Sequence, residues 1–164
     1  MLERLITQVG EHPKLAQWQP PLCGDMDMRI DRDGNWHSLG QPLARERMVR
    51  LFASVLRRED DGEYYLVTPV EKWRIKVDDL PFVLTDLCEQ DDGFWLVGPL
   101  GVRCKVNPDH PWAIINQLPA VELWHGNWAR LSRPLYYRLA EMAEHRDQGY
   151  GVMINDYWCV LAQD

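Results

Sequence analysis

Apolar and charged residues alternate along an early stretch of the chain. Met26, Met28 and Ile30 fall on one side of this stretch, and acidic or basic residues fall on the other. A period of two predicts a half-buried β-strand. The Asp33-Gly34 pair that follows predicts a type I′ turn, in which both central residues take a positive φ. We therefore expect a β-hairpin whose return strand starts directly after this turn.

Two other stretches carry apolar residues at the spacing of one helix face, each directly after a proline. Proline fits the first turn of a helix, where its missing N–H removes no hydrogen bond. We expect two amphipathic helices that supply much of the core. Their apolar positions are Ala44, Met48, Leu51, Phe52 and Val55 after Pro42, and Leu135, Leu139, Met142 and Ala143 after Pro134.

The ten residues 34–43 return as 126–135, with six of the ten positions identical in register. In both copies the helical pattern and then a second run of β-formers follow. This repeat predicts an α+β chain of duplicated β-hairpin, helix, β-hairpin units with antiparallel sheets. The expected domains are an N-terminal helical leader at 1–19, a first repeat unit at 20–79, and a β-rich middle section with the second repeat unit at 80–164.

The middle and the end of the chain carry further hairpin signals. An Asp-Asp-Gly turn predicts a hairpin over residues 82–97, and the last hairpin is expected to turn at Asn155-Asp156. Residues 112–123 have a mixed strand and loop character. A weak helical pattern covers residues 2–10 of the leader.

Composition narrows the class of protein. The chain has 164 residues, 46% of them hydrophobic and 26% charged, which is typical of a globular protein. A formal net charge of −7 argues against DNA, RNA and anionic membranes as partners, since each of these attracts a basic face. The chain has no apolar run of spanning length and no signal-type start, so we expect a cytoplasmic protein. The four separated cysteines, Cys23, Cys88, Cys104 and Cys159, are expected to be buried thiols.

Two long blocks resemble a known bacterial family. The blocks are PLCGDMDMRI at 21–30, continued by DGNW at 33–36, and YYLVTPVEK at 64–72. They are similar to domain-of-unknown-function family 1285, and the Asp-His-Pro loop at 109–111 also fits. The resemblance extends over residues 20–161.

That resemblance implies a duplicated core whose C-terminal half is superficially similar to pleckstrin-homology-like folds. It also implies a role in bacterial signal transduction, with a small, nucleotide-like ligand at the interface between the halves. The second copy lacks clear counterparts of the polar residues of the first. The first unit is therefore expected to supply most polar groups of any site.

Asp25 and Asp27 are the first candidates for chemistry. An EF-hand reading fails, because Arg29 would stand at the first position of the loop and Gly40 at the twelfth. Two interpretations stay open for the pair. They form a solvated strand face, or they contact a ligand or an isolated Mg²⁺ ion.

Thr68, Glu71 and Lys72 surround a proline-led turn, next to a basic strand face that continues through Arg74 and Lys76. Such a turn can hold a phosphate by charge-assisted hydrogen bonds, or it can be an ordinary surface arrangement. The chain has no Walker loop and no Gly-rich dinucleotide motif after a strand. Any nucleotide binding would therefore be of an unfamiliar kind.

His110 and Trp36 complete the candidates. The loop histidine can take part in recognition or proton transfer, or it can cap backbone groups. The tryptophan can form part of the core, or it can stack against a base. The five histidines show no motif spacing to a nucleophile, so no catalytic constellation is predicted.

The sequence favours a non-enzymatic module that binds a small anionic or nucleotide-like ligand. A protein-interaction module that pairs through a sheet edge, and an enzyme acting on a phosphorylated metabolite, remain alternatives. The sequence leaves any cofactor unknown. The expected ligand-binding residues are Asp25, Asp27, Trp36, Thr68, Glu71, Lys72 and His110.

Overall fold

The computed structural model describes residues 14–164, so the helix expected at residues 2–10 lies outside the described part. The chain forms two compact units that are not continuous in sequence. Unit 1 covers Met1–Pro81 and Leu123–Asn127, and unit 2 covers Phe82–Glu122 and Trp128–Asp164. Within the described residues, no helix is both long enough and apolar enough to cross a membrane.

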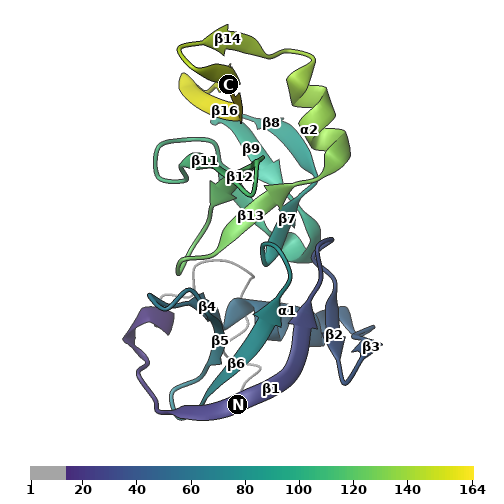
Figure 1. Ribbon diagram of the computed structural model, residues 1–164, viewed down its shortest axis with the longest axis vertical. Coiled ribbons are helices and arrows are strands. Elements are labelled where there is room, and N and C mark those ends of the chain that lie inside the picture. Colours follow the sequence, from purple (N-terminus) through teal and green to yellow (C-terminus); the bar gives the residue numbers. More distant parts are fainter. Residues whose placement is uncertain (1–13) are drawn as a thin grey trace. The chain divides into compact units, whose positions relative to one another are not determined.

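Unit 1 is built on a six-stranded sheet with the order β3-β2-β1-β6-β5-β4. Strands β1 and β6 run parallel to each other, and the other neighbours are antiparallel. Figure 1 shows β1 and β6 side by side in this sheet. The strands are β1 (Leu22–Ile30), β2 (Trp36–Ser38), β3 (Gln41–Pro42), β4 (Leu56–Arg58), β5 (Tyr64–Val67) and β6 (Lys72–Val77).

Strand β1 confirms the alternating pattern, because Met28 and Ile30 are buried while Arg29 between them is exposed. The turn after β1 is a hairpin turn, but the expected type I′ geometry is wrong. Only Gly34 has a positive φ, of 83°, and Asp33 does not. The Asp31 carboxylate accepts hydrogen bonds from two main-chain N–H groups of the turn, which favours a turn with one left-handed residue.

Helix α1 (Glu46–Ser54) begins later than expected. Pro42 does not start it, because this residue pairs with His37 as part of the edge strand β3, where a missing N–H costs nothing. The later start also changes which residues are buried. Val49 is buried and Met48 is 40% exposed, so the predicted stripe is wrong at Met48.

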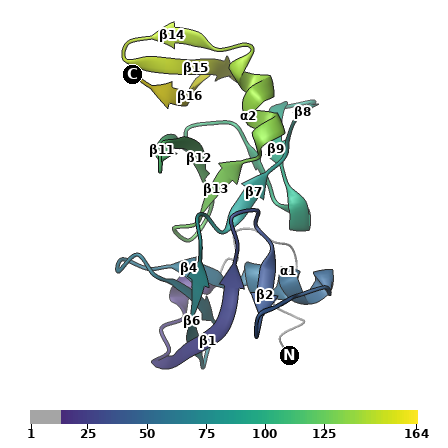
Figure 2. The same ribbon diagram turned by 45° about the vertical axis from the view of Figure 1, so that its right-hand side comes forward.

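Trp36 is a core residue of unit 1. Its side chain is only 2% exposed, and its ring stacks on that of Phe52 from α1, with the ring centroids 6.3 Å apart. The core interpretation of this tryptophan is therefore confirmed. Figure 2 shows α1 next to β2, which is the strand that carries Trp36.

Two segments from outside this sheet complete unit 1. The short helix η2 (Leu15–Gln17) buries Leu15 fully against Tyr65 and Val67 of β5. The segment Leu123–Asn127 bonds to β4, where the Arg58 N–H donates to the carbonyl of His125 at 3.0 Å. The side-chain amide of Asn127 also donates to the Leu56 carbonyl, at 3.0 Å.

Unit 2 contains three small sheets, with the orders β10-β9-β8, β11-β12-β13-β7 and β14-β15-β16. Strands β7 and β13 are parallel, and the other neighbours are antiparallel. The first sheet has β8 (Asp86–Gln90), β9 (Gly93–Val97) and β10 (Arg103–Lys105), with the helix η3 (Pro99–Gly101) between the last two. The other strands are β7 (Phe82–Leu84), β11 (Trp112–Ile115), β12 (Leu118–Glu122), β13 (Trp128–Leu131), β14 (Glu144–Arg146), β15 (Gly149–Ile154) and β16 (Tyr157–Gln163).

Helix α2 (Arg133–Ala140) starts as predicted, with Pro134 in its first turn and the Ser132 hydroxyl accepting from a main-chain N–H. Leu135 and Leu139 are buried, but Met142 lies beyond the helix end and is 56% exposed. The order of hairpin, helix and hairpin recurs in both copies. The predicted α+β fold with duplicated units is therefore confirmed, and the pleckstrin-like likeness stays a prediction.

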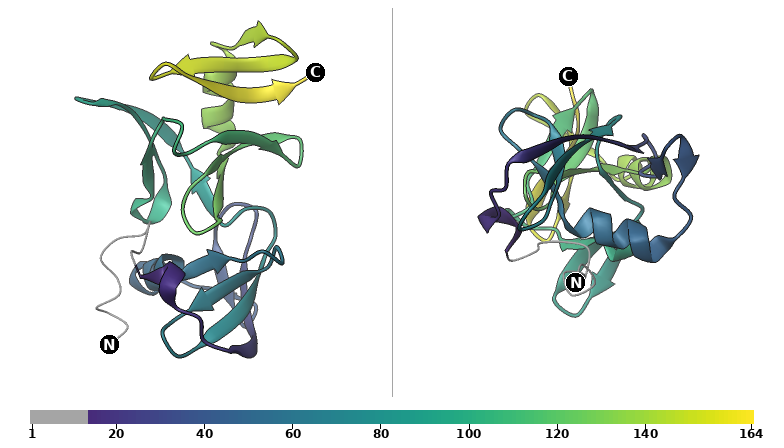
Figure 3. Two further views of the ribbon diagram at one scale, coloured as in Figure 1. Left: turned by 90° about the vertical axis from the view of Figure 1, so that its left-hand side faces the viewer. Right: turned by 90° about the horizontal axis from the view of Figure 1, so that it is seen from below.

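Two hairpins of unit 2 show which turns could be predicted from the sequence and which could not. The last hairpin turns at Asn155 and Asp156, both with positive φ as a type I′ turn requires. Figure 3 shows this hairpin with β16 in yellow. Residues 112–122 also form a regular hairpin, β11 and β12, where the sequence indicated a mixed region. Its turn residues, Asn116 and Gln117, contain no glycine although both have positive φ.

The cysteines agree with the expectation in part. Cys104 and Cys159 are buried, and burial raises the pKa of each thiol to about 12. Cys23 is exposed and Cys88 is only partly buried, so the expectation of burial is wrong for these two residues. Cys23 lies at the start of β1, ahead of the alternating part of the strand.

Candidate functional site

One face of the unit 1 sheet carries a band of ionisable side chains. In the sheet register Arg29 lies opposite His37 on one side and opposite Lys76 on the other. Asp25 lies opposite Arg74 in the same way. Side chains of paired residues point to the same face of a sheet. The band therefore runs across β2, β1 and β6.

A bulge in β1 shapes this band. Between Asp25 and Arg29 the strand advances four residues while β6 advances only two, from Arg74 to Lys76. Extra residues in one strand bend it and redirect side chains, which is common next to functional sites. Asp27 sits at this bulge, and its carboxylate makes no hydrogen bond or ion pair with the residues that the structure describes.

The band lines a groove of about 640 Å³. Acidic, basic and apolar side chains all contribute to it, so the groove is polar without being dominated by one sign of charge. The lining residues are Asp25, Met26, Asp27, Met28, Arg29, His37, Gly40, Glu63, Arg74, Ile75 and Lys76.

Some of the charges in the groove are neutralised within the sheet. Arg74 Nε donates to Asp25 Oδ1 at 2.6 Å. This hydrogen bond is the main cause that lowers the pKa of Asp25 and raises that of Arg74. Arg29 lies 3.4 Å from the carboxylate of Asp78, at the end of β6. The Asp25 carboxylate is therefore ionised at neutral pH.

Lys76 is different. Its ammonium makes no hydrogen bond or ion pair within residues 14–164, and its neighbour across the sheet is Arg29, a second cation. Like charges directly opposite each other destabilise a sheet. The groove thus holds a pair of adjacent cations. Arg29 has a direct acidic partner in Asp78, whereas Lys76 has only the longer-range attraction of Asp25, whose pKa it helps to lower.

Asp31 fixes the histidine of the groove. Its Oδ2 lies 2.8 Å from Nε2 of His37, and its Oδ1 accepts from the N–H groups of Asp33 and Asn35. Burial raises the pKa of the Asp31 carboxyl, but these hydrogen bonds together outweigh burial and lower it. The hairpin between β1 and β2 is therefore stabilised by an ionised carboxylate.

This arrangement predicts how acid affects stability. The pKa of Asp31 is lower in the folded than in the unfolded state, so its contribution is complete above about pH 4 and is lost as the pH falls through the folded value. We expect Asp31→Asn to reduce the loss of unfolding free energy between about pH 6 and about pH 3, measured by urea denaturation. Asp33→Asn in the same turn is the control. Equal pH dependence in wild type and Asp31→Asn would contradict this assignment.

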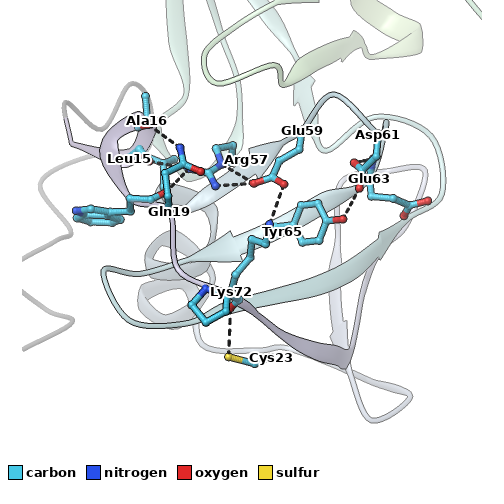
Figure 4. A network of polar contacts seen from close by, with 12 residues as sticks. Leu15, Ala16, Gln19, Cys23, Arg57, Glu59, Asp61, Glu63, Tyr65 and Lys72 are labelled. Carbon is cyan, nitrogen blue, oxygen red and sulfur yellow. Dashed lines mark hydrogen bonds and ion pairs between the residues drawn. The ribbon is translucent and has the colours of Figure 1, made fainter.

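A second polar network lies on the same sheet, next to the leader (Figure 4). Lys72 Nζ lies 2.9 Å from Glu59 Oε1 and 4.7 Å from the centre of the Tyr65 ring. Arg57 Nε donates to the other oxygen of Glu59 at 3.1 Å. Burial raises the pKa of Glu59, and the hydrogen bonds from Lys72 and Arg57 lower it by more.

Arg57 connects this network to the leader. Its guanidinium is largely buried, and Nη1 donates to the carbonyls of Leu15 at 2.9 Å and Trp18 at 2.8 Å. Figure 4 shows the Arg57 side chain between Leu15 and Glu59. Each charge of the network already has an opposite partner, so we interpret it as structural.

The predicted site residues fall in different places. Asp25 and Asp27 line the groove, whereas Lys72 belongs to the structural network and Trp36 to the core. Thr68 closes its turn, since its hydroxyl accepts from the N–H of Glu71 at 3.0 Å. Glu71 is exposed.

His110 is in unit 2, where its Nδ1 lies 2.9 Å from the carbonyl of Glu122. This contact matches the backbone-capping interpretation. Its role in ligand binding stays a prediction. Within the described residues, no group of three or more His, Cys, Asp or Glu side chains could hold a metal ion.

Sequence reasoning missed Arg29, His37, Arg74 and Lys76 as site residues. The alternating bases of β6 were visible in the sequence, but the partner strand was not. Strands β1 and β6 are separated by more than 40 residues and pair in parallel. Parallel pairing leaves no turn signal between two strands.

Comparison with known proteins identifies the family. The model described as "Domain of unknown function (DUF1285), N-terminal domain" matches residues 13–80. None of the functionally curated proteins is significantly similar to the chain. A crystal structure of a DUF1285 family protein from Shewanella baltica OS155 has a TM-score of 0.59 and 29% identity, covering 71% of this chain and 91% of that one.

A second crystal structure extends the match over nearly the whole chain. It is of a DUF1285 family protein from Silicibacter pomeroyi DSS-3, with a TM-score of 0.83 and 36% identity. The alignment covers 98% of this chain and 92% of the other. Because identity at this level extends over almost the full length of both proteins, the chain belongs to the DUF1285 family.

Proposed function

We propose that this protein is a non-enzymatic module that binds a small anionic ligand in the groove of unit 1. The observation that carries this proposal is the adjacent pair Arg29 and Lys76, two cations side by side in a concave surface. An anion bound between them relieves their repulsion and forms charge-assisted hydrogen bonds with both. A phosphate, as in a nucleotide-like ligand, or a carboxylate has the required oxygens.

Binding is favoured over catalysis by the state of the acids. A general acid or base works best with a pKa near the operating pH. The pKa of Asp25 is lowered instead, because Arg74 holds its carboxylate. Asp27 at the bulge is available to accept a hydrogen bond from a hydroxyl or amino group of the ligand. A role in bacterial signal transduction and a cytoplasmic location, both expected from the sequence, are part of this proposal.

Lys76→Met is expected to weaken anion binding at least about tenfold, since a charge-assisted contact is worth roughly 1.5 kcal/mol or more. The same variant should unfold at an equal or higher temperature than wild type, because it removes one of two neighbouring cations. Loss of binding together with unchanged or greater stability separates a ligand contact from a structural role. Thermal unfolding and calorimetric titration measure the two quantities.

Inorganic phosphate, AMP and adenosine are suitable probes, because adenosine offers the base and sugar without the anion. We expect phosphate and AMP to bind and adenosine to bind more weakly. Lys105→Met is the matched control, since it removes the same charge from unit 2, where Lys105 pairs with Asp92 at 3.6 Å. Equal affinity of wild type and Lys76→Met for AMP, or no binding of either anion, would contradict the proposal.

A further inference from the structure

We infer that strand β14 is a homotypic docking edge, at which two copies of the chain pair antiparallel along Glu144–Arg146. This inference concerns unit 2 and does not depend on ligand binding in the groove. It rests on three features of the strand: a free edge, a self-complementary sequence and exposed apolar residues on the neighbouring strand.

The edge of β14 is free in the described part of the chain. The sheet has the order β14-β15-β16, so β14 has one neighbour, and Figure 2 shows it as the outer strand. An unpaired edge presents a row of N–H and C=O groups that can accept another strand.

The register shows which groups of the edge point outward. Arg146 pairs with Gly149 across a two-residue turn, which is a hydrogen-bonded position in such hairpins. Hydrogen-bonded and non-hydrogen-bonded pairs alternate along an antiparallel ladder. His145 and Tyr150 are therefore a non-hydrogen-bonded pair, and their rings are in contact with centroids 4.8 Å apart. It follows that the N–H and C=O of His145 point away from β15.

The sequence of the edge is complementary to itself. If two copies of β14 run antiparallel with His145 opposite His145, each Glu144 lies opposite Arg146 of the other copy. Opposite charges across a strand pair are favourable, and like charges are not. Both side chains are exposed, and within one chain Arg146 Nη2 already lies 3.2 Å from Glu144 Oε2. Pairing of two copies would produce an alternating ring of four charges.

Apolar residues continue from this edge onto β15. Tyr150, in contact with His145, is 47% exposed, and Met153 is 46% exposed. On the next strand Trp158 is half-buried, and the Arg146 guanidinium covers its ring at 4.7 Å. Exposed apolar side chains beside a free edge are typical of an interaction surface. Because the edge is only three residues long, we expect a weak dimer that forms with rising concentration.

Sedimentation velocity of the full chain tests this inference by charge exchange. Glu144→Arg alone and Arg146→Glu alone each place like charges opposite each other, and each should weaken dimerisation at least about tenfold. The double exchange, Glu144→Arg with Arg146→Glu, restores the opposite charges and should restore the dimer. A mixture of the two single variants should also associate, because its strands complement each other.

Two controls separate this contact from general charge effects. Arg133→Glu makes the same charge change at an exposed position on α2 and should leave dimerisation unchanged. His145→Pro removes the outward N–H without removing a bond to β15, and should weaken the dimer. Circular dichroism checks that each variant is folded. A wild-type chain that stays monomeric up to about 1 mM, or single variants that dimerise as wild type does, would overturn the inference.

Discussion

Arg57→Ala is expected to lower the free energy of unfolding by about 3 kcal/mol, the largest effect of any single polar substitution proposed for this protein. The side chain is buried and donates to the carbonyls of Leu15 and Trp18, both of which would lose this charged donor. Glu59 would keep only Lys72 as a counter-charge. Each of these changes leaves a polar group poorly paired in a region of low solvent exposure, where the cost is highest.

Urea denaturation measures this effect, and the neighbouring residue provides the control. Arg58 is exposed, so Arg58→Ala should change the free energy of unfolding by less than about 0.5 kcal/mol. Hydrogen exchange adds a local readout, since residues 15–18 should exchange faster in Arg57→Ala. If Arg57→Ala costs no more than Arg58→Ala, Arg57 does not hold the leader.

Gly98→Ala is expected to destabilise the protein by at least about 2 kcal/mol, although its backbone conformation is open to any residue. A Cβ atom at this position would lie 2.1 Å from the main-chain oxygen of Val83 and 3.3 Å from Cα of Leu84. Both contacts are with the backbone of β7, which cannot move aside as a flexible side chain can. The substitution therefore forces apart two segments that are in close contact.

Gly40→Ala is the comparison, because it adds backbone strain without a steric clash. Gly40 has a φ of 76°, and a Cβ atom there would meet nothing within 4 Å. Its cost should be the backbone strain alone, about 1 kcal/mol. We expect Gly98→Ala to have a clearly lower urea midpoint than Gly40→Ala. The reverse order would mean that the close approach at Gly98 relaxes easily.

Local patterns predicted much of the secondary structure. The alternation before Ile30, the start of α2 at Pro134 and the Asn155-Asp156 turn are all settled by neighbouring residues, and each was confirmed. The prediction that α1 starts at Pro42 was wrong, because the local sequence there does not decide between two structures. Pro42 satisfies both a helix start and an edge strand, and only the pairing of β3 with β2 decides between them.

The candidate groove could not be predicted from local sequence patterns. Its charges come from β1, β2 and β6, and what matters is which of them become neighbours. Asp25 gains Arg74 as a partner, whereas Arg29 lies opposite Lys76. Without the bulge between these two pairs, Asp27 would lie opposite Lys76 instead. The bulge in β1 sets this register, and no residue type in the strand predicts that a bulge forms there. The acidic half of the site could therefore be predicted, and its basic half could not be placed.

The segment Leu123–Asn127 has a consequence for how the protein is made. It supplies the carbonyl that accepts from the Arg58 N–H and the amide that donates to Leu56. A nascent chain that has emerged from the ribosome as far as Pro81 still lacks these partners for β4. At about 5–20 residues per second, residue 127 follows roughly 2 to 10 s later. During translation, unit 1 is therefore completed by a segment that is synthesised only after the whole β10-β9-β8 sheet of unit 2.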